Sequence, residues 1–292
     1  MKSGFVSLIG RPNVGKSTLI NALVGEKVTI TSPKAQTTRN TINCILNTDS
    51  SQIILVDTPG IVPKATNKLG RFMENSTSSA RSGMDIIIMV VTPDKVIGPG
   101  DRAIIETLKG VVFLAINKID TISKPELLTV IDAYSNAYNF AEIIPISALT
   151  GELNNLVGII ESYLKEGPKY FPDDIVTDRP ERQIASEFLR EKLLHYLQQE
   201  IPHGIAVEIL RMSPRKDKEI VDIDAIIYCE RDSHKGIIIG KNGEMLKKIS
   251  TQARLDIERL LGSKIFLQTK VKVKKDWRNN DIILKNLGYV AD

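Results

Sequence analysis

The sequence predicts an α/β fold in which a doubly wound parallel sheet is followed by a smaller α+β domain. Three observations carry this prediction. Short apolar runs rich in Ile and Val alternate with helical stretches over residues 1–166, a segment rich in proline and aspartate follows, and the pattern then changes. Continuous apolar runs are typical of strands buried on both faces of a parallel sheet, and the helical stretches between them indicate crossover connections.

The first domain is expected to contain five buried strands with helices between them. Its strands are predicted at residues 5–9, 53–56, 86–91, 111–116 and 142–146. Its helices are predicted at residues 17–24, 66–82, 102–109, 125–138 and 152–166. Residues 41–49 alternate more between polar and apolar side chains, so they are expected to form an edge strand antiparallel to the next run.

The second domain is expected to begin after an extended linker. The composition of GPKYFPDDIVTDRP divides the chain into a first domain over residues 1–168, a linker over 169–183 and a second domain over 184–292. In the second part we expect a helix over 181–199, strands over 205–212 and 220–231, a loop, a helix over 244–261 and a strand over 264–273.

The composition is typical of a globular protein without a membrane span. The 292 residues are 42% hydrophobic and 25% charged, and no apolar run approaches the roughly 20 residues that a membrane helix needs. The first residues lack the apolar stretch of a signal peptide, so a cytoplasmic location is expected. Residues 1–180 carry no net charge and residues 181–292 carry the whole of the +4, which favours a polyanionic partner for the C-terminal part.

A phosphate-binding loop is predicted after the first strand. The stretch GRPNVGKST, residues 10–18, fits the pattern G-x-x-x-x-G-K-S between a strand and a helix. Its glycines let successive backbone N–H groups point at phosphates, and the start of the helix adds the positive end of its dipole. Lys16 is expected to bind the β- and γ-phosphates, and the hydroxyl of Ser17 is expected to bind Mg²⁺.

Two motifs further along the chain predict the base. NKID, which begins at Asn117, follows a predicted strand, at the sheet edge where open α/β folds bind ligands. The Asp120 carboxylate can accept hydrogen bonds from N1–H and the 2-amino group of guanine, a pair of donors that adenine lacks. Lys118 is expected to lie over the base, and Asn117 to tie this loop to the phosphate loop. In ISA, the N–H of Ala148 is expected to donate to guanine O6.

DTPG and the polar segment before it complete the predicted phosphate site. Asp57 is expected to hold Mg²⁺ through a water molecule, and the Gly60 N–H to face the γ-phosphate. Residues 32–40, SPKAQTTRN, have no apolar periodicity, which suits a segment that the γ-phosphate orders and hydrolysis releases. Thr38 is the candidate for the second Mg²⁺ hydroxyl, with Thr37 as the alternative. The expected catalytic residues are Lys16, Thr38, Asp57 and Gly60.

Together these stretches resemble one branch of the GTPases. GRPNVGKST, QTTRN, DTPGI and NKID are similar in type and order to the TrmE–Era branch, which implies GTP hydrolysis with Mg²⁺. The resemblance puts Ile61 where Ras-like proteins carry the glutamine that orients water, which a hydrophobic side chain cannot do. Asn13 matches an asparagine that helps bind K⁺ in potassium-dependent relatives, so K⁺ is a second expected cofactor. The expected nucleotide contacts are Gly10, Arg11, Pro12, Asn13, Val14, Gly15, Lys16, Ser17, Thr18, Asp57, Thr58, Pro59, Gly60, Ile61, Asn117, Lys118, Ile119, Asp120, Ser147 and Ala148.

The second domain carries a loop that is typical of RNA binding. GKNG, within an α-β-β-α-β order and before a basic amphipathic helix, fits the G-x-x-G loop of a KH domain, and the strands before it indicate the type 2 arrangement. Trp277 is expected either to stack on a base or to anchor the packing. The expected RNA contacts are Gly240, Lys241, Asn242, Gly243, Lys247 and, from the cationic face of KVKVKK, Lys272 and Lys274.

A GTPase domain followed by a KH domain is the layout of the Era family, which the chain resembles over nearly its whole length. The resemblance implies binding to single-stranded RNA near the 3′ end of the small-subunit ribosomal RNA, and a role in assembly of the 30S subunit. We expect a monomer with at most peripheral contact with the inner face of the cell membrane. The alternatives are an RNA-binding module with a structural G domain, a GTPase of tRNA modification, and a metabolic phosphotransferase, against which NKID argues.

Overall fold

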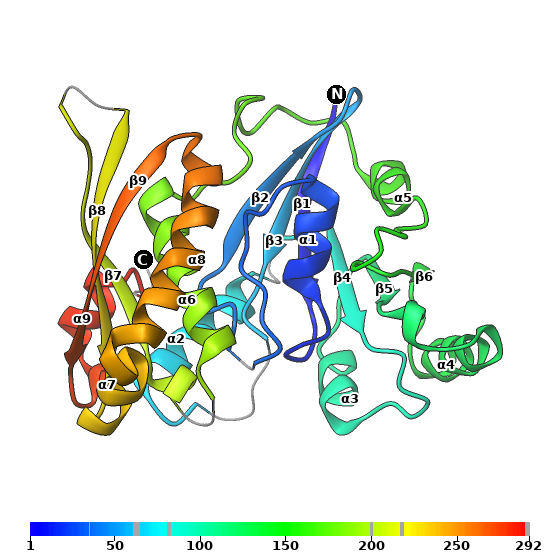
Figure 1. Cartoon of the computed structure of the whole chain (residues 1–292). Helices are drawn as coiled ribbons and strands as arrows, with labels where there is room; N and C mark the ends of the chain where they lie inside the picture. The colour runs from blue at the N-terminus through cyan, green and yellow to red at the C-terminus, as the bar shows by residue number, and fades with distance from the viewer. Residues whose placement is uncertain (35, 61–64, 81–82, 199–200, 217–218, 290–292) are drawn as a thin grey trace. The chain divides into compact units, whose positions relative to one another are not determined.

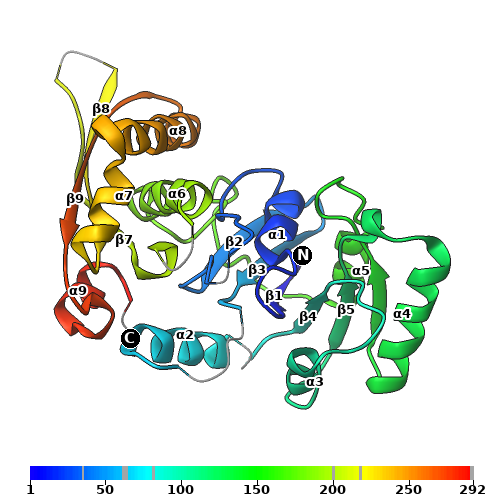
Figure 2. The same ribbon diagram turned by 60° about the horizontal axis from the view of Figure 1, so that its bottom comes forward.

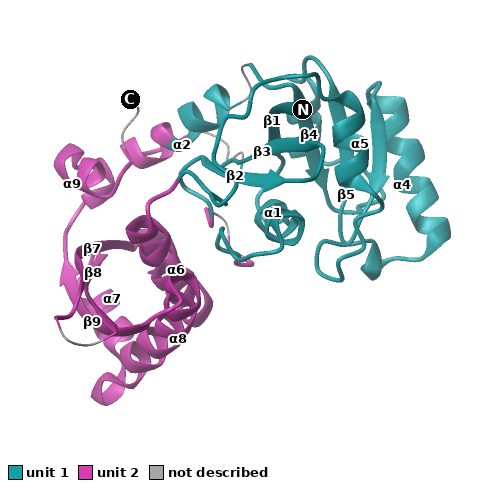
Figure 3. Cartoon of the chain, turned by 90° about the horizontal axis from the view of Figure 1, so that it is seen from above, with its two compact units in different colours: residues 1–31, 38–63, 73–178 teal, residues 32–37, 64–72, 179–292 magenta. Residues whose placement is uncertain are grey.

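The computed structural model (Figure 1) describes residues 1–34, 36–60, 65–80, 83–198, 201–216 and 219–289. Their contacts divide the chain into two units, coloured differently in Figure 3. The main boundary falls between Asp178 and Arg179, inside the segment predicted to be a linker. Unit 1 comprises Met1–Thr31, Thr38–Pro63 and Met73–Asp178, and unit 2 comprises Ser32–Thr37, Lys64–Phe72 and Arg179–Asp292.

Unit 1 is built on a six-stranded sheet with the order β2-β3-β1-β4-β5-β6. Its strands are β1 (Lys2–Ile9), β2 (Ile42–Asn47), β3 (Ser51–Asp57), β4 (Ile86–Val91), β5 (Val112–Ile116) and β6 (Glu142–Pro145). The edge strand β2 is antiparallel to β3 and the other neighbours are parallel, as predicted. Every residue of β3, β4 and β5 is buried, which is the property that their continuous apolar runs predict.

Helices cover both faces of this sheet (Figure 2). The helical segments of unit 1 are α1 (Lys16–Val24), α3 (Pro99–Ile105), η1 (Ile119–Thr121, a short 3₁₀ turn), α4 (Lys124–Ala137) and α5 (Leu156–Tyr163), and α2 (Lys68–Ser79) is divided between the two units after Phe72. One buried cluster joins α1 and α5 to the sheet, and another joins α3 and α4 to it. Helix α3 begins earlier than the predicted residue 102, because a proline is well placed in the first turn of a helix. Helix α5 is shorter than the predicted 152–166.

Part of the predicted linker lies along the edge of this sheet within unit 1. Thr177 forms an antiparallel bridge with Cys44 of β2. The buried side chain of Gln52 donates to the Phe171 carbonyl at 2.8 Å and accepts from the Tyr170 N–H at 2.7 Å. An edge strand leaves a row of backbone groups without partners, so this segment covers the edge that β2 would otherwise expose.

Unit 2 contains a three-stranded sheet with the order β7-β8-β9. Strands β7 and β8 are antiparallel, and β8 and β9 are parallel. The elements are α6 (Glu181–Tyr196), η2 (Ile201–Gly204), β7 (Ala206–Pro214), β8 (Ile220–Cys229), α7 (Asp232–Ile239), η3 (Lys241–Gly243), α8 (Glu244–Leu261), β9 (Lys264–Val273), η4 (Trp277–Asn279) and α9 (Asp281–Asn286).

Helix α7 corrects the sequence prediction, which placed a loop between the second strand and the long helix. The observed order is α-β-β-α-α-β, followed by the short helix α9. The helix contains Gly236 and a run of three isoleucines. These residue types have low to modest helix propensity, so the local sequence does not predict a helix here. Ile238 is fully buried, and this packing stabilises the helix where propensity does not. None of the helices in the described ranges is both long and apolar enough to cross a membrane.

Candidate nucleotide and nucleic-acid sites

The phosphate loop connects β1 to α1, as its motif predicts. Gly15 ends the loop in the left-handed region, at φ 101°, and precedes the first residue of α1. A Cβ atom on Gly15 would lie 2.3 Å from Nδ2 of Asn117, so only glycine fits where the loop approaches NKID. The first N–H groups of a helix have no intrahelical partner, and at this position they are available to an anion in the loop.

Lys16 is buried inside this loop. Its ammonium group donates to the carbonyl oxygens of Gly10 and Arg11, each at 3.1 Å. Burial lowers the pKa of Lys16 to about 8, although the charge of Asp57 acts in the opposite direction. A phosphate in the loop would favour the charged form and would be a stronger partner than two neutral carbonyl groups.

Three oxygen-bearing side chains meet beside the phosphate loop. Ser17 Oγ donates to Asp57 Oδ2 at 2.8 Å, and Thr38 Oγ1 lies 3.1 Å from Ser17 Oγ and 3.2 Å from Asp57 Oδ2. Thr37 Oγ1 instead donates to the carbonyl of Lys34 at 2.6 Å. Thr38 and Thr37 were the two candidates for the second Mg²⁺ hydroxyl, and of these Thr38 lies in the cluster and Thr37 does not.

Asp57 is the charged member of this cluster. Its side chain is fully buried, and burial raises the pKa of the carboxyl while Lys16 and the two hydroxyl groups lower it. Its Oδ1 atom has no hydrogen-bond partner among the described residues. Mg²⁺ prefers oxygen ligands, and a buried carboxylate with an unpaired oxygen beside two hydroxyls suits it. These residues fit the ion that the sequence predicts.

The rest of DTPG lies between β1 and the phosphate loop. The buried Thr58 donates from Oγ1 to the Leu8 carbonyl at 2.7 Å, which holds the motif to β1. A Cβ atom on Gly60 would lie 3.0 Å from the backbone of Pro12, so the motif closely approaches the phosphate loop. Ile61, predicted to replace a water-orienting glutamine, lies outside the described residues.

NKID, at the carboxyl end of β5, is tied to the phosphate loop by two side chains. Asn117 Nδ2 donates to the Val14 carbonyl at 2.8 Å, and Lys118 Nζ donates to the Asn13 carbonyl at 2.9 Å. The structure therefore brings together two motifs that are about one hundred residues apart in the sequence.

Asp120 is oriented by the ISA stretch. Its Oδ1 accepts a hydrogen bond from Ser147 Oγ at 2.6 Å. The Ala148 N–H, predicted to donate to guanine O6, instead donates to Asn117 Oδ1 at 2.9 Å. A contact of Ala148 with the base would require this bond to be shared or broken. The structure thus adds an interaction between NKID and ISA that the motifs do not reveal.

The predicted G-x-x-G loop of unit 2 joins α7 to α8. Gly240 ends α7 at φ 73°, and a Cβ atom there would lie 2.7 Å from Cβ of Met245, so the close approach of the two helices requires glycine. Lys241 and Asn242 are exposed, and Gly243 precedes the first residue of α8. The Gly243 N–H donates to the Gly240 carbonyl at 3.2 Å, which closes the loop, and the exposed Lys241 presents a positive charge that is accessible to a phosphate.

A groove of about 480 Å³ continues from this loop between α8 and β9. Lys247, predicted to contact RNA, lines it, whereas Lys272 and Lys274 are not among its lining residues. Phe266 was not predicted from the sequence as a residue of this groove. Its side chain is 48% exposed, as its position in the alternating strand indicates. The groove is lined by Gly243, Leu246, Lys247, Ser250, Thr251, Arg254, Ile265, Phe266, Leu267 and Thr269.

Neither the lysines in and just after β9 that were predicted to bind RNA nor Trp277 is among the described residues that line this groove. In β9 the side chains of Lys270 and Lys272 are exposed and that of Val271 is buried, as the alternation predicts. Trp277 is fully buried, and its Nε1–H donates to the Gly204 carbonyl at 2.9 Å. Of the two roles considered for Trp277, the structure supports the packing anchor, because a buried indole offers no face to a base.

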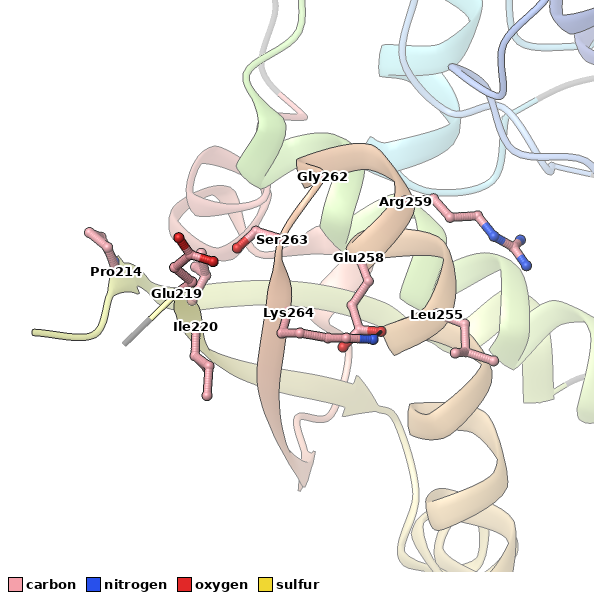
Figure 4. Close-up of a pocket in the computed structure, with 10 residues that line it drawn as sticks. Pro214, Glu219, Ile220, Leu255, Glu258, Arg259, Gly262, Ser263 and Lys264 are labelled. Carbon is pink, nitrogen blue, oxygen red and sulfur yellow. Dashed lines mark hydrogen bonds and ion pairs between the residues drawn. The ribbon is translucent and has the colours of Figure 1, made fainter. Parts of the chain in front are cut away.

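A second pocket lies at the other end of α8 (Figure 4). It has a volume of about 740 Å³ and is lined by apolar, acidic and basic side chains. Lys264 Nζ lies 3.5 Å from Glu258 Oε2, so its charged groups are partly paired with one another. None of the sequence motifs falls here. The pocket is lined by Pro214, Glu219, Ile220, Val221, Leu255, Glu258, Arg259, Gly262, Ser263 and Lys264.

A phosphate loop, a buried carboxylate beside two hydroxyl groups and NKID on one edge of a doubly wound sheet define a P-loop GTPase, here followed by a KH domain. Two family models agree with this class. One described as a 50S ribosome-binding GTPase matches residues 5–118, and one described as a KH domain matches residues 200–278.

The relatives identify the family. The chain is 57% identical to the GTPase Era of Clostridioides difficile over 99% of this chain and 98% of that protein. It is 52% identical to the GTPase Era of Caldanaerobacter subterraneus, over 100% and 99% of the two chains. The chain therefore belongs to the GTPase Era family, and it is a GTP hydrolase.

Two solved structures agree over the full length. One is Era in complex with MgGDPNP and nucleotides 1506–1542 of 16S ribosomal RNA, and the other is a single-residue variant of Aquifex aeolicus Era bound to GDP·AlF₄⁻. Each is 39% identical to this chain, covers 100% of both chains and has a TM-score of 0.95. The prediction of a doubly wound GTPase domain followed by a KH domain is confirmed.

Proposed function

We propose that this chain is a GTP-controlled switch that holds the 3′ segment of small-subunit ribosomal RNA and assists assembly of the 30S subunit. The relative that binds MgGDPNP and 16S ribosomal RNA, alike over the whole chain, supports this function. The observation that carries the proposal is the position of Thr38. Its hydroxyl lies 3.1 Å from Ser17 Oγ, so the segment before β2 ends at the phosphate site.

In the nucleotide site each side chain has a defined task. Lys16 and the N–H groups at the start of α1 bind the phosphates and stabilise the charge that develops during hydrolysis. Ser17, Thr38 and Asp57 would hold Mg²⁺, which when bound neutralises phosphate charge. Asp120 selects guanine. Loss of the γ-phosphate removes the interaction that keeps Thr38 in place, and the segment is then released.

In unit 2 the G-x-x-G loop and the neighbouring groove hold single-stranded RNA. The backbone of residues 240–243 receives a phosphate, and Lys241 and Lys247 supply positive charge. Unstacked bases enter the groove between α8 and β9. We infer that the chain acts as a monomer in the cytoplasm and that any contact with the cell membrane is peripheral.

The test is RNA binding in three nucleotide states. Purified protein is titrated with a fluorescent RNA from the 3′ end of the small-subunit ribosomal RNA, at one fixed salt concentration, with GDPNP, with GDP and without nucleotide. A switch requires differential affinity, so we expect binding about fivefold or more tighter with GDPNP. Equal affinity in all three states would contradict the control by GTP.

A Lys16→Ala variant separates the switch from a constitutive RNA-binding module with a structural G domain. Under the switch, this variant should bind RNA with one affinity whichever nucleotide is added, because it cannot hold the phosphates. If wild-type and variant chains have the same RNA affinity in every state, the G domain is structural and the alternative function holds.

We also infer that K⁺ contributes to hydrolysis beside Asn13. The side chain of Asn13 is exposed in the phosphate loop, so it is accessible to a cation. We expect GTP turnover to be about tenfold or more faster in K⁺ than in Na⁺ buffer of equal ionic strength, less than the ~10³–10⁵-fold effect of an arginine finger. Asn13→Ala should remove the difference. Equal turnover of the wild type in both buffers would rule out the K⁺ site.

A further inference from the structure

We propose that Asp101 is a positioning residue of the nucleotide site, which fixes Arg11 of the phosphate loop and thereby slows the release of nucleotide. Asp101 lies in the first turn of α3 and belongs to none of the nucleotide motifs. The inference rests on the proposed nucleotide site and adds a support that reaches the phosphate loop from outside those motifs.

The side chain of Arg11 is held by α3 and by the segment that joins β4 to α3. Its Nε donates to Asp101 Oδ1 at 2.9 Å, and its Nη2 donates to Asp94 Oδ2 at 2.8 Å and to Thr92 Oγ1 at 3.2 Å. A Cβ atom on Gly100 would lie 2.9 Å from Cδ of Arg11, so the backbone of α3 closely approaches the arginine stem. Three oxygen atoms and one backbone contact thus define the position of this side chain.

Asp101 differs from the other acceptors because it is buried. Its side chain is 0% exposed, whereas those of Arg11 and Asp94 are 32% and 55% exposed. Its Oδ2 accepts from the hydroxyl of Tyr134, a buried residue of α4, at 3.0 Å. An exposed ion pair contributes little, but a buried carboxylate requires its partners. The Asp101–Arg11 pair is therefore expected to hold the Arg11 side chain more strongly than the contacts with Asp94 and Thr92 do.

The pair bears on nucleotide binding through the backbone of Arg11. The carbonyl of Arg11 accepts a hydrogen bond from Lys16 Nζ at 3.1 Å, so the arginine links the lysine of the loop to α3. NKID holds the later part of the loop through the carbonyls of Asn13 and Val14. The Asp101–Arg11 pair holds the early part. A loop held at both parts loses less conformational freedom when nucleotide binds, which favours a slow release.

The experiment measures release of the fluorescent nucleotide mant-GDP from the full chain in the presence of Mg²⁺. We expect Asp101→Asn, which removes the negative charge of the acceptor, and Arg11→Met, which removes the donor, each to accelerate release about tenfold, because a hydrogen bond between charged groups is the stronger kind. The double variant should release no faster than either single variant, because both remove the same interaction. Tyr134→Phe is the matched control: it removes the other partner of Asp101 and leaves Arg11 untouched. It should lower the urea midpoint but release mant-GDP at the wild-type rate.

Two results would overturn the inference: wild-type release from Asp101→Asn, or acceleration by Tyr134→Phe equal to that by Asp101→Asn, which would indicate a role in stability alone. If Asp101→Asn does not fold, Arg11→Met, at a partly exposed position, tests the inference by itself, and release of mant-GDP at the wild-type rate from this variant would overturn it. A wild-type chain that does not retain mant-GDP would contradict the nucleotide site itself. The release of mant-GDP does not depend on RNA affinity. The inference about Asp101 can therefore hold even if the proposed control of RNA binding by GTP is wrong.

Discussion

Asp120→Asn is expected to weaken GTP binding by about two to four orders of magnitude and to confer binding of xanthosine triphosphate. The carboxylate would accept two hydrogen bonds from guanine, and each bond to a charged group contributes ~1.5–3 kcal/mol. Asparagine replaces one acceptor with a donor, which repels the 2-amino group of guanine and suits the 2-carbonyl of xanthine. Direct titration of the wild type and the variant with mant-GTP and with mant-XTP measures the change.

The control for this substitution is Asp132→Asn. Asp132 is an exposed carboxylate on α4, so its replacement removes the same charge from unit 1 without touching NKID. It should leave both affinities unchanged. Retained guanine selectivity in Asp120→Asn would contradict the assignment of the base contact. A loss of GTP binding with no gain of XTP binding would instead indicate that the bond to Ser147 supports the loop.

Gly243→Asp is expected to weaken RNA binding by about a hundredfold and to leave GTP binding unchanged. Gly243 has φ 79° at the start of α8, so a side chain there strains the backbone, but a Cβ atom would meet nothing within 4 Å and causes no steric clash. The cost would come from a negative charge where an RNA phosphate is expected, since juxtaposed like charges cost several kcal/mol. The RNA titration described above measures it.

The Gly243→Asn variant distinguishes the effect of the negative charge on RNA binding from the effect of adding a side chain. Asparagine has nearly the same size as aspartate and tolerates positive φ, but it carries no charge. We expect it to bind RNA more tightly than Gly243→Asp, with a difference between the two that narrows as salt is added. RNA affinity of Gly243→Asp equal to that of the wild type would show that the RNA site lies elsewhere.

Much of the fold was predictable because its signals are local. Strands such as β4 are continuously apolar because they are covered on both faces, and this property is visible in six consecutive residues. The phosphate loop and NKID each follow such a strand. The G-x-x-G loop is recognisable from two glycines before a basic helix. By contrast, α7 was missed, because burial of Ile238 rather than local propensity stabilises it.

The class of fold, the order of the motifs and the two kinds of ligand they imply can all be predicted from the amino-acid sequence, since each depends on neighbouring residues. The folded chain was needed to show which of two adjacent threonines meets Ser17 and Asp57, and that the Ala148 N–H donates to Asn117. It also decided that Lys247, and not Lys272, lines the groove beside the G-x-x-G loop. The physical reason is that each outcome depends on which residues distant in the chain lie next to one another, and no local pattern encodes this.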